Sequence, residues 1–472
     1  MSTLQSTADS DPIAPAAPAI SWRGEFVALF ALAWPLILAQ LAQNAIFTTD
    51  VIFMGQLGAK YLAAGTLGAS FFIAFQLFGM GLVGVVAPLV AQALGARDIK
   101  AIRRIVRAGL WASLLISALV VPLGLNSRFF FRLLGQTEEL SVMAEQFLHY
   151  STWTIIPALM FIVLRSFLAA LEATRVILLI TIAGVFANAL GNYLLVAGNL
   201  GFPRLELRGS GITTTSVNCF MLLLSVLYVV TNRRFRRYHV FARFLQPDWQ
   251  RLGEIFRIGT PIGLMLFAEV GLFVSAAFAM GWLGTDEVAG HAVALQLTSI
   301  TFMVPLGLSQ ATTVRVGYAF GSGSREGVRM AGWLSLALTV AFMSMTCLIF
   351  ILIPDPLVVL FLDPTREENR AAVGLAASYL LVAGLFQVFD GAQVTAGAAL
   401  RGLSDTTWPL FIALFGYWLV GMPVGLALGF GLGWRGLGIW TGLASGLAVV
   451  AAILVIRFAM RERLGLLDAK PA

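Results

Sequence analysis

Long apolar runs, each long enough to cross a lipid bilayer as a helix, recur along the whole sequence. The first run extends from about Phe26 to Phe53 and contains a single charged residue, Asp50. At about 1.5 Å of rise per residue, a run of this length spans the roughly 30 Å of a bilayer's hydrocarbon core. Backbone polar groups must bond internally there, so such runs predict helices. The twelve predicted spans cover residues 26–53, 61–92, 106–125, 146–170, 176–198, 212–231, 255–283, 288–319, 330–354, 372–400, 408–430 and 436–459.

Composition and charge indicate the same class of protein. Apolar residues make up 59% of the chain and charged residues 12%, whereas a soluble domain is about a quarter charged. Basic residues gather at the ends of apolar runs, as at 233–237, and the positive-inside rule then places both termini in the cytoplasm. The net charge of +7 therefore indicates basic residues that anchor the chain at the membrane surface. We expect a lipid bilayer and no nucleic acid as a partner.

The sequence repeats itself at a shift of 226 residues. At this shift Pro35 aligns with Pro261 (261 − 35 = 226), and Gly55 aligns with Gly281. Each half contains six predicted spans, so both halves enter the membrane in the same orientation and are expected to be related by a pseudo-two-fold axis along the membrane normal. The predicted fold is all-α, with a disordered cytoplasmic tail (1–21), an N-terminal lobe (22–231), a basic cytoplasmic linker (232–254), a C-terminal lobe (255–459) and a cytoplasmic tail (460–472).

Three carboxylates, Asp50, Glu269 and Asp390, lie inside apolar runs. A charge at the centre of a bilayer costs about 2.5–3.5 kcal/mol on insertion scales, so it indicates a functional site by default. The repeat does not preserve these acids, which favours a role in function over one in the architecture. No Lys or Arg inside a neighbouring span is an obvious fixed partner, because Arg165 and Arg315 are expected toward the cytoplasmic ends of their spans.

Helical spacing places polar or aromatic side chains beside each acid. Their amide and hydroxyl oxygens can hydrogen-bond a neutral carboxyl group or complete the oxygen shell of a cation, and the alternative is that they satisfy one another between packed helices. Burial favours the neutral acid and a bound cation favours the charged one, so protons and metal ions can neutralise the same group. The positions are Gln43 before Asp50, Thr181 with Asn188 and Asn192 in the fifth span, Phe273 after Glu269, and Gln387 and Gln393 around Asp390.

Pro35 removes one helix hydrogen bond in the middle of the first span, and it is either a hinge or a static kink. The stretch Gly79-Met-Gly81-Leu-Val-Gly84 matches a nucleotide-binding pattern but lies inside an apolar span, where glycines serve helix packing. The sequence contains no phosphate-binding G-x-x-x-x-G-K-[ST] loop. We therefore expect a monomeric transporter and not an enzyme, with no cofactor other than a transported ion.

Several stretches together are similar to one family of transporters. They are Trp34-Pro35, Thr49-Asp50-Val51 and Met54-Gly55 in the first span, Phe267-Ala-Glu269-Val in the seventh, and Phe386-Gln-Val-Phe-Asp390-Gly-Ala-Gln393 followed by Ala399-Leu-Arg401-Gly402-Leu-Ser-Asp405-Thr406 in and after the tenth. With these motifs the chain resembles the multidrug and toxic compound extrusion (MATE) family, and its NorM-like branch most closely. The resemblance implies a two-lobed exporter of the bacterial inner membrane that expels amphipathic, often cationic drugs and dyes in exchange for Na⁺ or H⁺.

By position, the resemblance implies an N-lobe cation site at Asp50 with Asn188 and Asn192. It implies a C-lobe site at Glu269 and Asp390, where Na⁺ could bind. Some relatives have Tyr where this chain has Phe386; the ring face remains without the hydroxyl, so the ion of this site stays open.

Two other functions remain as alternatives. A flippase for a lipid-linked or polysaccharide precursor belongs to the same fold superfamily, but it would be expected to hold several Arg or Lys residues inside to bind phosphates. A receptor or channel is disfavoured by the two-lobe repeat and the buried acids.

Overall fold

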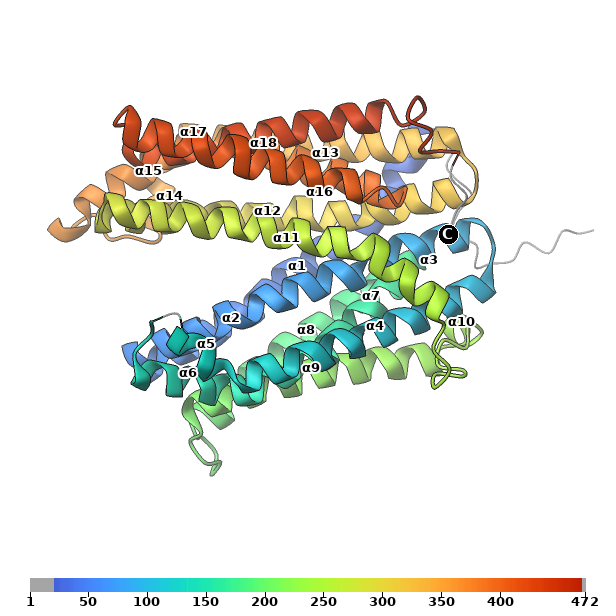
Figure 1. Cartoon of the computed structure of the whole chain (residues 1–472), viewed down its shortest axis with the longest axis horizontal. Helices are drawn as coiled ribbons and strands as arrows, with labels where there is room; N and C mark the ends of the chain where they lie inside the picture. The colour runs from blue at the N-terminus through green and yellow to red at the C-terminus, as the bar shows by residue number, and fades with distance from the viewer. Residues whose placement is uncertain (1–20, 134, 469–472) are drawn as a thin grey trace, which may run out of the picture.

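A computed structural model describes residues 21–133 and 135–468, and twelve helices in this part of the chain are long and apolar enough to cross a membrane. These helices confirm the twelve predicted spans, most with ends within a few residues of the prediction. Figure 1 shows them running side by side in two groups. The predicted tail at 1–21 lies, except for residue 21, outside the described residues, as do the last four residues of the tail at 460–472.

The first six spans form one group. Three of them are interrupted helices: the second is interrupted at Val85, the fourth contains a short 3-10 turn, and the fifth ends in a π-helical turn. Two short helices, at 127–133 and 233–236, lie where the chain turns between spans. They were not predicted, because their few residues form no long apolar run. The elements are α1 (Trp22–Leu57), α2 (Ala59–Gly84), α3 (Val86–Gly95), α4 (Ile99–Leu125), α5 (Ser127–Leu133), α6 (Glu138–Ser151), η1 (Thr152–Thr154), α7 (Ile155–Ala170), α8 (Thr174–Gly191), η2 (Asn192–Val196), α9 (Glu206–Thr231) and α10 (Arg233–Arg236).

The last six spans form the second group. Its fifth span alternates between α-helical and π-helical turns, and the others are continuous. Helix α15 packs against α12, α13 and α18. The elements are α11 (Trp249–Leu283), α12 (Thr285–Gly321), α13 (Arg325–Leu352), α14 (Pro354–Val359), η3 (Glu367–Asn369), α15 (Arg370–Gly402), α16 (Thr407–Leu414), η4 (Phe415–Gly421), α17 (Met422–Leu426), η5 (Ala427–Gly431) and α18 (Arg435–Ala459).

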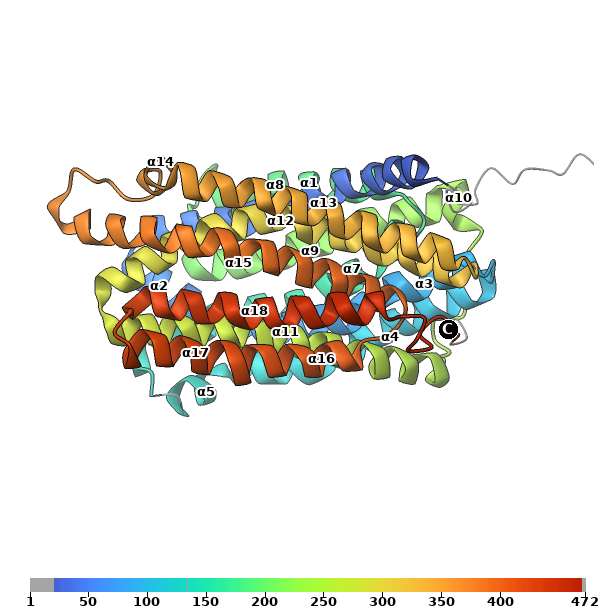
Figure 2. The same cartoon turned by 90° about the horizontal axis from the view of Figure 1, so that it is seen from above.

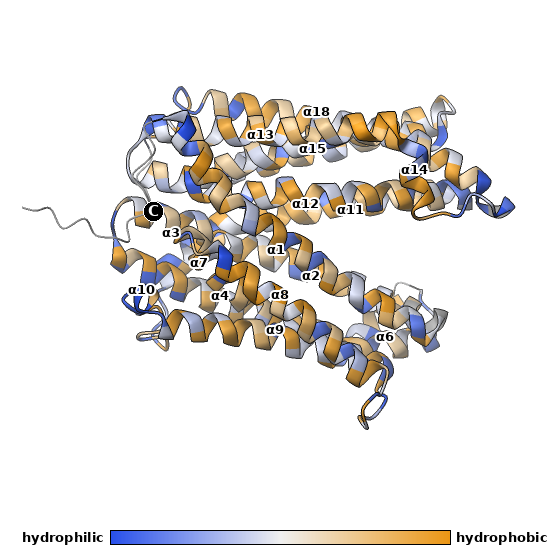
Figure 3. Cartoon of the chain, turned by 180° about the vertical axis from the view of Figure 1, so that it is seen from behind, coloured by the Kyte–Doolittle hydropathy of each residue, from blue (hydrophilic) through white to orange (hydrophobic). Residues whose placement is uncertain are grey.

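The two groups, here called the N-lobe and the C-lobe, meet near one end of the molecule and diverge toward the other (Figure 1). Residues 460–468 and α10 lie at the end where the lobes meet, which we call the linker end. The view in Figure 2 shows α18, α15 and α13 lying over the N-lobe helices. Hydrophilic residues gather at both ends and apolar residues cover the middle of the helices (Figure 3). This distribution fits helices that cross a bilayer along their length.

Glycines allow the lobes to approach closely near the linker end. A Cβ atom on Gly81 of α2 would lie 2.6 Å from the Cα atom of Gly263 of α11, and one on Gly307 of α12 would lie 2.6 Å from the Cα atom of Ile37. Only glycine fits such contacts, in which one backbone lies directly against another. The interpretation of Gly81 as a packing glycine is thus confirmed.

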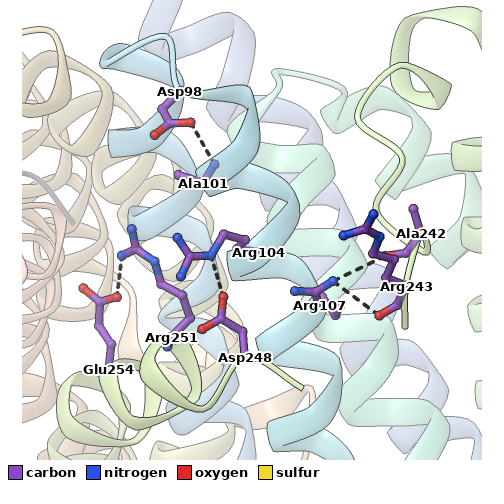
Figure 4. A network of polar contacts seen from close by, with 9 residues as sticks. All are labelled: Asp98, Ala101, Arg104, Arg107, Ala242, Arg243, Asp248, Arg251 and Glu254. Atoms are coloured by element: carbon purple, nitrogen blue, oxygen red, sulfur yellow. Dashed lines mark hydrogen bonds and ion pairs between the residues drawn. The ribbon is translucent and has the colours of Figure 1, made fainter. Parts of the chain in front are cut away.

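The linker between the lobes is fastened to the N-terminal half of α4 by polar contacts (Figure 4). Arg104 donates to the Asp248 carboxylate at 2.5 Å, and Arg107 lies 3.3 Å from the carbonyl oxygen of Arg243. The indole nitrogen of Trp111 donates to the carbonyl of Phe244 at 2.8 Å. The covalent connection between the lobes is therefore tied to the N-lobe and does not hang free.

Candidate functional site

Asp50 lies near the end of α1 that is remote from the linker, between α8 and α9. Its Oδ1 accepts hydrogen bonds from Nδ2 of Asn188 at 2.9 Å and from Nδ2 of Asn192 at 2.7 Å. The Thr214 hydroxyl lies 3.4 Å from Oδ2 and also 2.9 Å from the carbonyl oxygen of Ser210. Asp50 is 8% exposed, and no basic side chain pairs with it in the described part of the chain. Neutral donors alone therefore stabilise its charged form.

The amide pair is positioned by an irregular stretch of helix. Asn192 is the first residue of the π-helical turn η2, and π-helical turns occur frequently at functional sites. Its Oδ1 is buried without a hydrogen-bond partner among the residues described. This oxygen and Oδ2 of Asp50 are ligands of the type that hard cations prefer. The same carboxylate oxygen can also accept a proton, so both kinds of neutralising ion fit this site chemically.

Two of the supporting positions predicted for Asp50 do not join it. The Thr181 hydroxyl is buried and donates to the carbonyl of Ile177 on its own helix at 2.8 Å. Gln43 is partly exposed on α1, with no hydrogen bond to Asp50 among the described contacts. Periodicity placed both residues on the correct helix, but the side chain of Thr181 is already satisfied locally. Pro35 is buried within α1, which runs through it as one continuous helix.

In the C-lobe, Gln387, Asp390 and Gln393 lie on one face of α15 and are all buried. Oε1 of Gln387 accepts from the Thr301 hydroxyl of α12 at 2.6 Å, and Nε2 of Gln393 donates to the Tyr417 hydroxyl at 2.5 Å. Within the described residues, Oδ1 of Asp390, Nε2 of Gln387 and Oε1 of Gln393 have no partner. Buried polar atoms are nearly always hydrogen-bonded, so three unpaired atoms on one helix face indicate a place for an ion or water.

Glu269 lies on the face of α11 that turns toward the C-lobe core. It is partly buried and close enough to Asp390 for the two carboxylates to interact electrostatically. The guanidinium of Arg401, at the linker end of α15, also interacts with Glu269 through space but forms no ion pair with it in the described chain. Two carboxylates that interact through space repel each other when both are charged, and a proton or cation bound at either one relieves this repulsion.

The basic residues considered as fixed partners have other partners. Arg315 forms an ion pair with Glu25 at 2.6 Å and lies 3.3 Å from Glu172. Arg165 donates to Gln40 at 2.5 Å and to Gln310 at 2.9 Å. These contacts join the two lobes near the linker end. They leave Asp50, Glu269 and Asp390 without a fixed basic partner in the part of the chain described.

The two predicted aromatic residues form part of the C-lobe core. The Phe273 and Phe386 rings contact each other edge to face with centroids 6.0 Å apart, and Phe386 also contacts Trp440 at 5.6 Å. Phe386 is 2% exposed. Its ring therefore packs beside the turn of α15 that carries Gln387 and Asp390.

Comparison with known proteins finds relatives in both sequence and structure. The sequence model of the MatE family matches residues 35–194 and 261–427. The chain is 44% identical to a probable multidrug resistance protein NorM of Mesorhizobium japonicum, over 95% of this chain and 96% of that protein. It is 42% identical to a protein of the same name from Brucella suis, with 93% of each chain covered. The crystal structure of the eukaryotic MATE transporter AtDTX14 has a TM-score of 0.83 at 20% identity and covers 94% of this chain and 99% of its own.

The chain belongs to the MatE family. The two matches begin 226 residues apart (261 − 35 = 226), which is the shift at which the sequence repeats itself. Each lobe is therefore one copy of the MatE unit. The acids of the two copies differ, as the sequence predicts, because Asp50 of the first copy aligns with Ala276 of the second.

Three residues near the MatE acids were missed by sequence reasoning. Thr214 contacts Asp50, Thr301 contacts Gln387, and Tyr417 contacts Gln393. Tyr417 had a usable signal, since it is a lone hydroxyl-bearing ring inside the apolar run 408–430. Thr214 and Thr301 had none, because threonine hydroxyls in membrane helices usually bond their own backbone.

An apolar pocket of about 460 Å³ lies between α11, α16 and η4. Helical spacing puts its α11 residues on the face opposite Glu269, so the pocket is not part of the acid site. Its lining is formed by Leu264, Phe267, Ala268, Gly271, Val274, Ser275, Leu410, Leu414 and Trp418.

Proposed function

We propose that this protein is a multidrug efflux antiporter that exports amphipathic, often cationic compounds in exchange for Na⁺ or H⁺ by alternating access. It would act as a monomer in the bacterial inner membrane with both termini in the cytoplasm. The names of its NorM relatives support the multidrug substrate class. The divergence of the lobes away from the linker end fits a form that is open on one side, as each state of an alternating-access cycle would be (Figure 1).

The observation that carries the coupling proposal is that the buried acids Asp50 and Asp390 have no basic partner among the described residues. Asp50 is surrounded by amide and hydroxyl donors, and Asp390 has an unpaired oxygen, with no ion pair to either acid in the described chain. An unneutralised buried charge is costly, so each acid gains stability from a bound proton or cation. An ion that binds one conformation more tightly than the other then shifts the balance between them.

The sites differ in what they offer to an ion. Asp50 is a single carboxylate with Asn188 and Asn192, whereas Glu269 and Asp390 form a carboxylate pair. A pair with two negative charges suits a cation or a shared proton better than a single acid does. We therefore propose two unequal coupling sites, one in each lobe.

The flippase alternative receives no support from the placement of basic residues. In the described spans, Arg165, Arg315 and Arg401 lie toward the linker end, and Arg315 is neutralised by glutamates. Along their helices, the acids lie farther from the linker end than these arginines do. Cationic cargo suits such a charge distribution better than a phosphate does.

Efflux from proteoliposomes under separate Na⁺ and pH gradients tests the proposal. Purified protein is reconstituted with a fluorescent cationic dye, and each gradient is imposed alone. Asp50→Asn, Glu269→Gln and Asp390→Asn are each expected to lower gradient-driven efflux by at least about tenfold, or 1.4 kcal/mol. Asp286→Asn is the matched control, because Asp286 is an exposed acid at the start of α12.

Each possible result supports or contradicts the antiporter proposal. Dye efflux that follows either gradient and falls in the three variants supports coupling at the acids. Dye movement independent of both gradients overturns the antiporter proposal. Wild-type efflux by all three variants would show that these acids do not couple ion movement to dye export.

A further inference from the structure

The apolar pocket between α11, α16 and η4 opens to the surface of the C-lobe. Leu264, Phe267 and Val274 of α11 line it, and these residues are between 43% and 54% exposed. Its volume of about 460 Å³ lies within the roughly 300–1,000 Å³ of small-molecule sites. Helices α11 and α16 belong to two of the segments that are long and apolar enough to cross a membrane, so the pocket opens among lipid acyl chains.

The pocket lies apart from the acid site and from the contact between the lobes. Leu264 and Gly271, about two turns apart, mark the middle of its α11 lining. At about 100° per residue, Leu264 points about 140° away from Glu269 around the helix axis and about 100° away from Gly263, which lies against α2. The pocket is therefore on a side of α11 that faces neither the acids nor the N-lobe.

A basic side chain and a hydroxyl group continue the lining of the pocket toward the linker end. Arg257 is seven residues before Leu264 on α11, and Thr407 is seven residues before Leu414 on α16. A separation of seven residues is about two helical turns, so each polar residue lies on the same face as the apolar residue that follows it. The pocket thus has an apolar body and a polar end.

Arg257 and Thr407 lie beside each other across the two helices. The Thr406 hydroxyl donates to the carbonyl of Ile258 at 2.9 Å, and these two residues are the chain neighbours of Thr407 and Arg257. Both Arg257 and Thr407 are exposed, and neither side chain forms a hydrogen bond or ion pair within the part of the chain that the structure describes. A positive charge and a hydroxyl donor are therefore free at this end of the pocket.

The acids nearest to this end of the pocket are paired with other arginines. Glu254, one turn before Arg257 on α11, pairs with Arg251 at 2.6 Å. Asp405, which precedes α16, pairs with Arg457 at 2.6 Å. The charge of Arg257 therefore remains available for a ligand from outside the chain.

The length of α11 places Arg257 at the level of the lipid head groups. Its 35 residues extend about 52 Å, whereas the hydrocarbon core of a bilayer is about 30 Å thick, so about 11 Å project from the core at each end of a centred helix. Arg257 lies eight residues (257 − 249 = 8), or about 12 Å, from the first residue of α11. Its guanidinium is then near the boundary where lipid phosphates begin, and the apolar pocket lies deeper in the core.

We propose that the pocket binds an anionic phospholipid, with one acyl chain between α11 and α16 and the phosphate at Arg257 and Thr407. Guanidinium and hydroxyl groups are donors that suit phosphate oxygens, and basic pockets between membrane helices bind anionic head groups. A lipid with a net negative charge binds more tightly than a zwitterionic lipid, because the amine of the latter offsets its phosphate. The inference goes beyond the proposed function, since it concerns neither a transported ion nor a transported drug.

Native mass spectrometry of the detergent-purified protein tests the head-group contact. Phosphatidylglycerol and phosphatidylethanolamine with identical acyl chains are titrated separately, and the affinity for phosphatidylglycerol is expected to be about fivefold higher. Arg257→Gln is expected to remove this preference. Arg236→Gln is the matched control and should keep it, because Arg236 is an exposed arginine of α10 outside the pocket lining. Equal affinities of the two lipids for the wild type, or an equal loss in both variants, overturns the proposal.

Leu264→Trp tests the acyl-chain contact, because the larger ring fills the pocket. It is expected to weaken phosphatidylglycerol binding about fivefold or more, while Leu227→Trp, at an exposed leucine of α9, leaves binding unchanged. An equal effect of the two variants would contradict the assignment of the chain to this pocket. Glycerol phosphate, which has the phosphate and no chain, is the competitor. Displacement of the lipid by millimolar glycerol phosphate would indicate a site for free phosphate and overturn the lipid proposal.

A second readout uses Trp418, whose indole lies against Gly271 at the end of the pocket remote from the linker. Brominated acyl chains quench tryptophan fluorescence on contact, and Trp418→Phe identifies the part of the fluorescence that comes from this residue. Brominated phosphatidylglycerol is expected to quench that part in the wild type and much less in Arg257→Gln, and no quenching of it overturns the proposal. None of these measurements involves transport, so their failure is distinguishable from failure of the antiporter function.

Discussion

Arg315 and Glu25 form a buried ion pair across the lobe interface, with Nη2 and Oε2 2.6 Å apart and both side chains less than 5% exposed. Arg315 belongs to α12 of the C-lobe and Glu25 to the first turn of α1 in the N-lobe. The pair lies near the linker end, where the lobes meet. Any movement that separates the lobes there must break this pair or carry its charges into water.

The first prediction concerns Arg315→Gln. Removing one partner of a buried pair leaves Glu25 unpaired, which typically costs about 3–5 kcal/mol. We expect a lower thermal unfolding temperature and increased labelling of cysteines introduced at the linker end. Arg325→Gln is the control, since Arg325 pairs with Asp468 and both are mostly exposed. Equal stability of the two variants would show that the pair does not hold the lobes together.

The second prediction ranks the donors around Asp50. A hydrogen bond to a charged group contributes about 1.5–3 kcal/mol, so Asn192→Ala is expected to weaken the apparent affinity for the coupling cation about tenfold or more. Thr214→Val removes a longer contact of 3.4 Å and should change it less than about threefold. Thr181→Val is the control, because its hydroxyl bonds only Ile177. Dependence of efflux rate on ion concentration measures each value, and a larger effect of Thr181→Val would refute the assignment.

The third prediction tests the backbone contact between lobes. Gly81→Ala places a methyl group 2.6 Å from the Cα of Gly263, and overpacking of this kind typically costs about 1–3 kcal/mol. We expect the lobes to separate more readily at the linker end, measured as distances between spin labels on α2 and α11. Gly84→Ala is the control in the same helix, since a Cβ there meets nothing within 4 Å. Identical distance distributions would contradict the contact.

The fourth prediction concerns pH and the linker. The hydrogen bond from Arg104 lowers the pKa of Asp248 below its usual value. A group whose pKa is lowered by folding stabilises the fold above its unfolded value of about 3.9 and loses this contribution as the pH falls through the folded value. Linker protection from hydrogen exchange should thus be constant from neutral pH to about pH 4 and decrease below it. Asp248→Asn should lack this acid step, and an unchanged step would assign it to other groups.

The fifth prediction concerns Pro35. If Pro35 is a hinge, Pro35→Ala restores one helix hydrogen bond and stiffens α1, so efflux slows while dye binding is retained. Pro305→Ala, a change of the buried proline inside α12, shows whether any mid-helix proline has this effect. Transport at the wild-type rate in Pro35→Ala would refute the hinge and favour the alternative that Pro35 is a static kink.

The fold was largely predictable because bilayer-spanning helices obey strong local rules. Length and hydropathy located the spans, and the repeated positions of Pro35 and Pro261 located the two copies. The interruptions were not predictable in this way. The π-helical turn that begins at Asn192 has the same apolar composition as the α-helix before it, so only the packing against α9 reveals it.

The candidate site was predictable along single helices and not between them. The i, i+4 spacing placed Asn188 and Asn192 on one face of their span, and the i, i+3 spacing aligned Gln387 with Asp390. That the two amides lie at Asp50 was implied by the family resemblance, and the hydrogen bonds to Asp50 agree with it. Contacts across helices depend on rotation about each axis, which one sequence does not encode in its periodicity. Thr214 was missed for this reason. The domain boundaries and the roles of the site residues stay predictions.

The contact of Gly81 with Gly263 has a mechanical consequence. Because main chain lies directly against main chain here, no side chain has to change its rotamer if the two helices separate and come together again. The close approach depends on the absence of a Cβ atom at Gly81, so a single added methyl group would force the two helices apart.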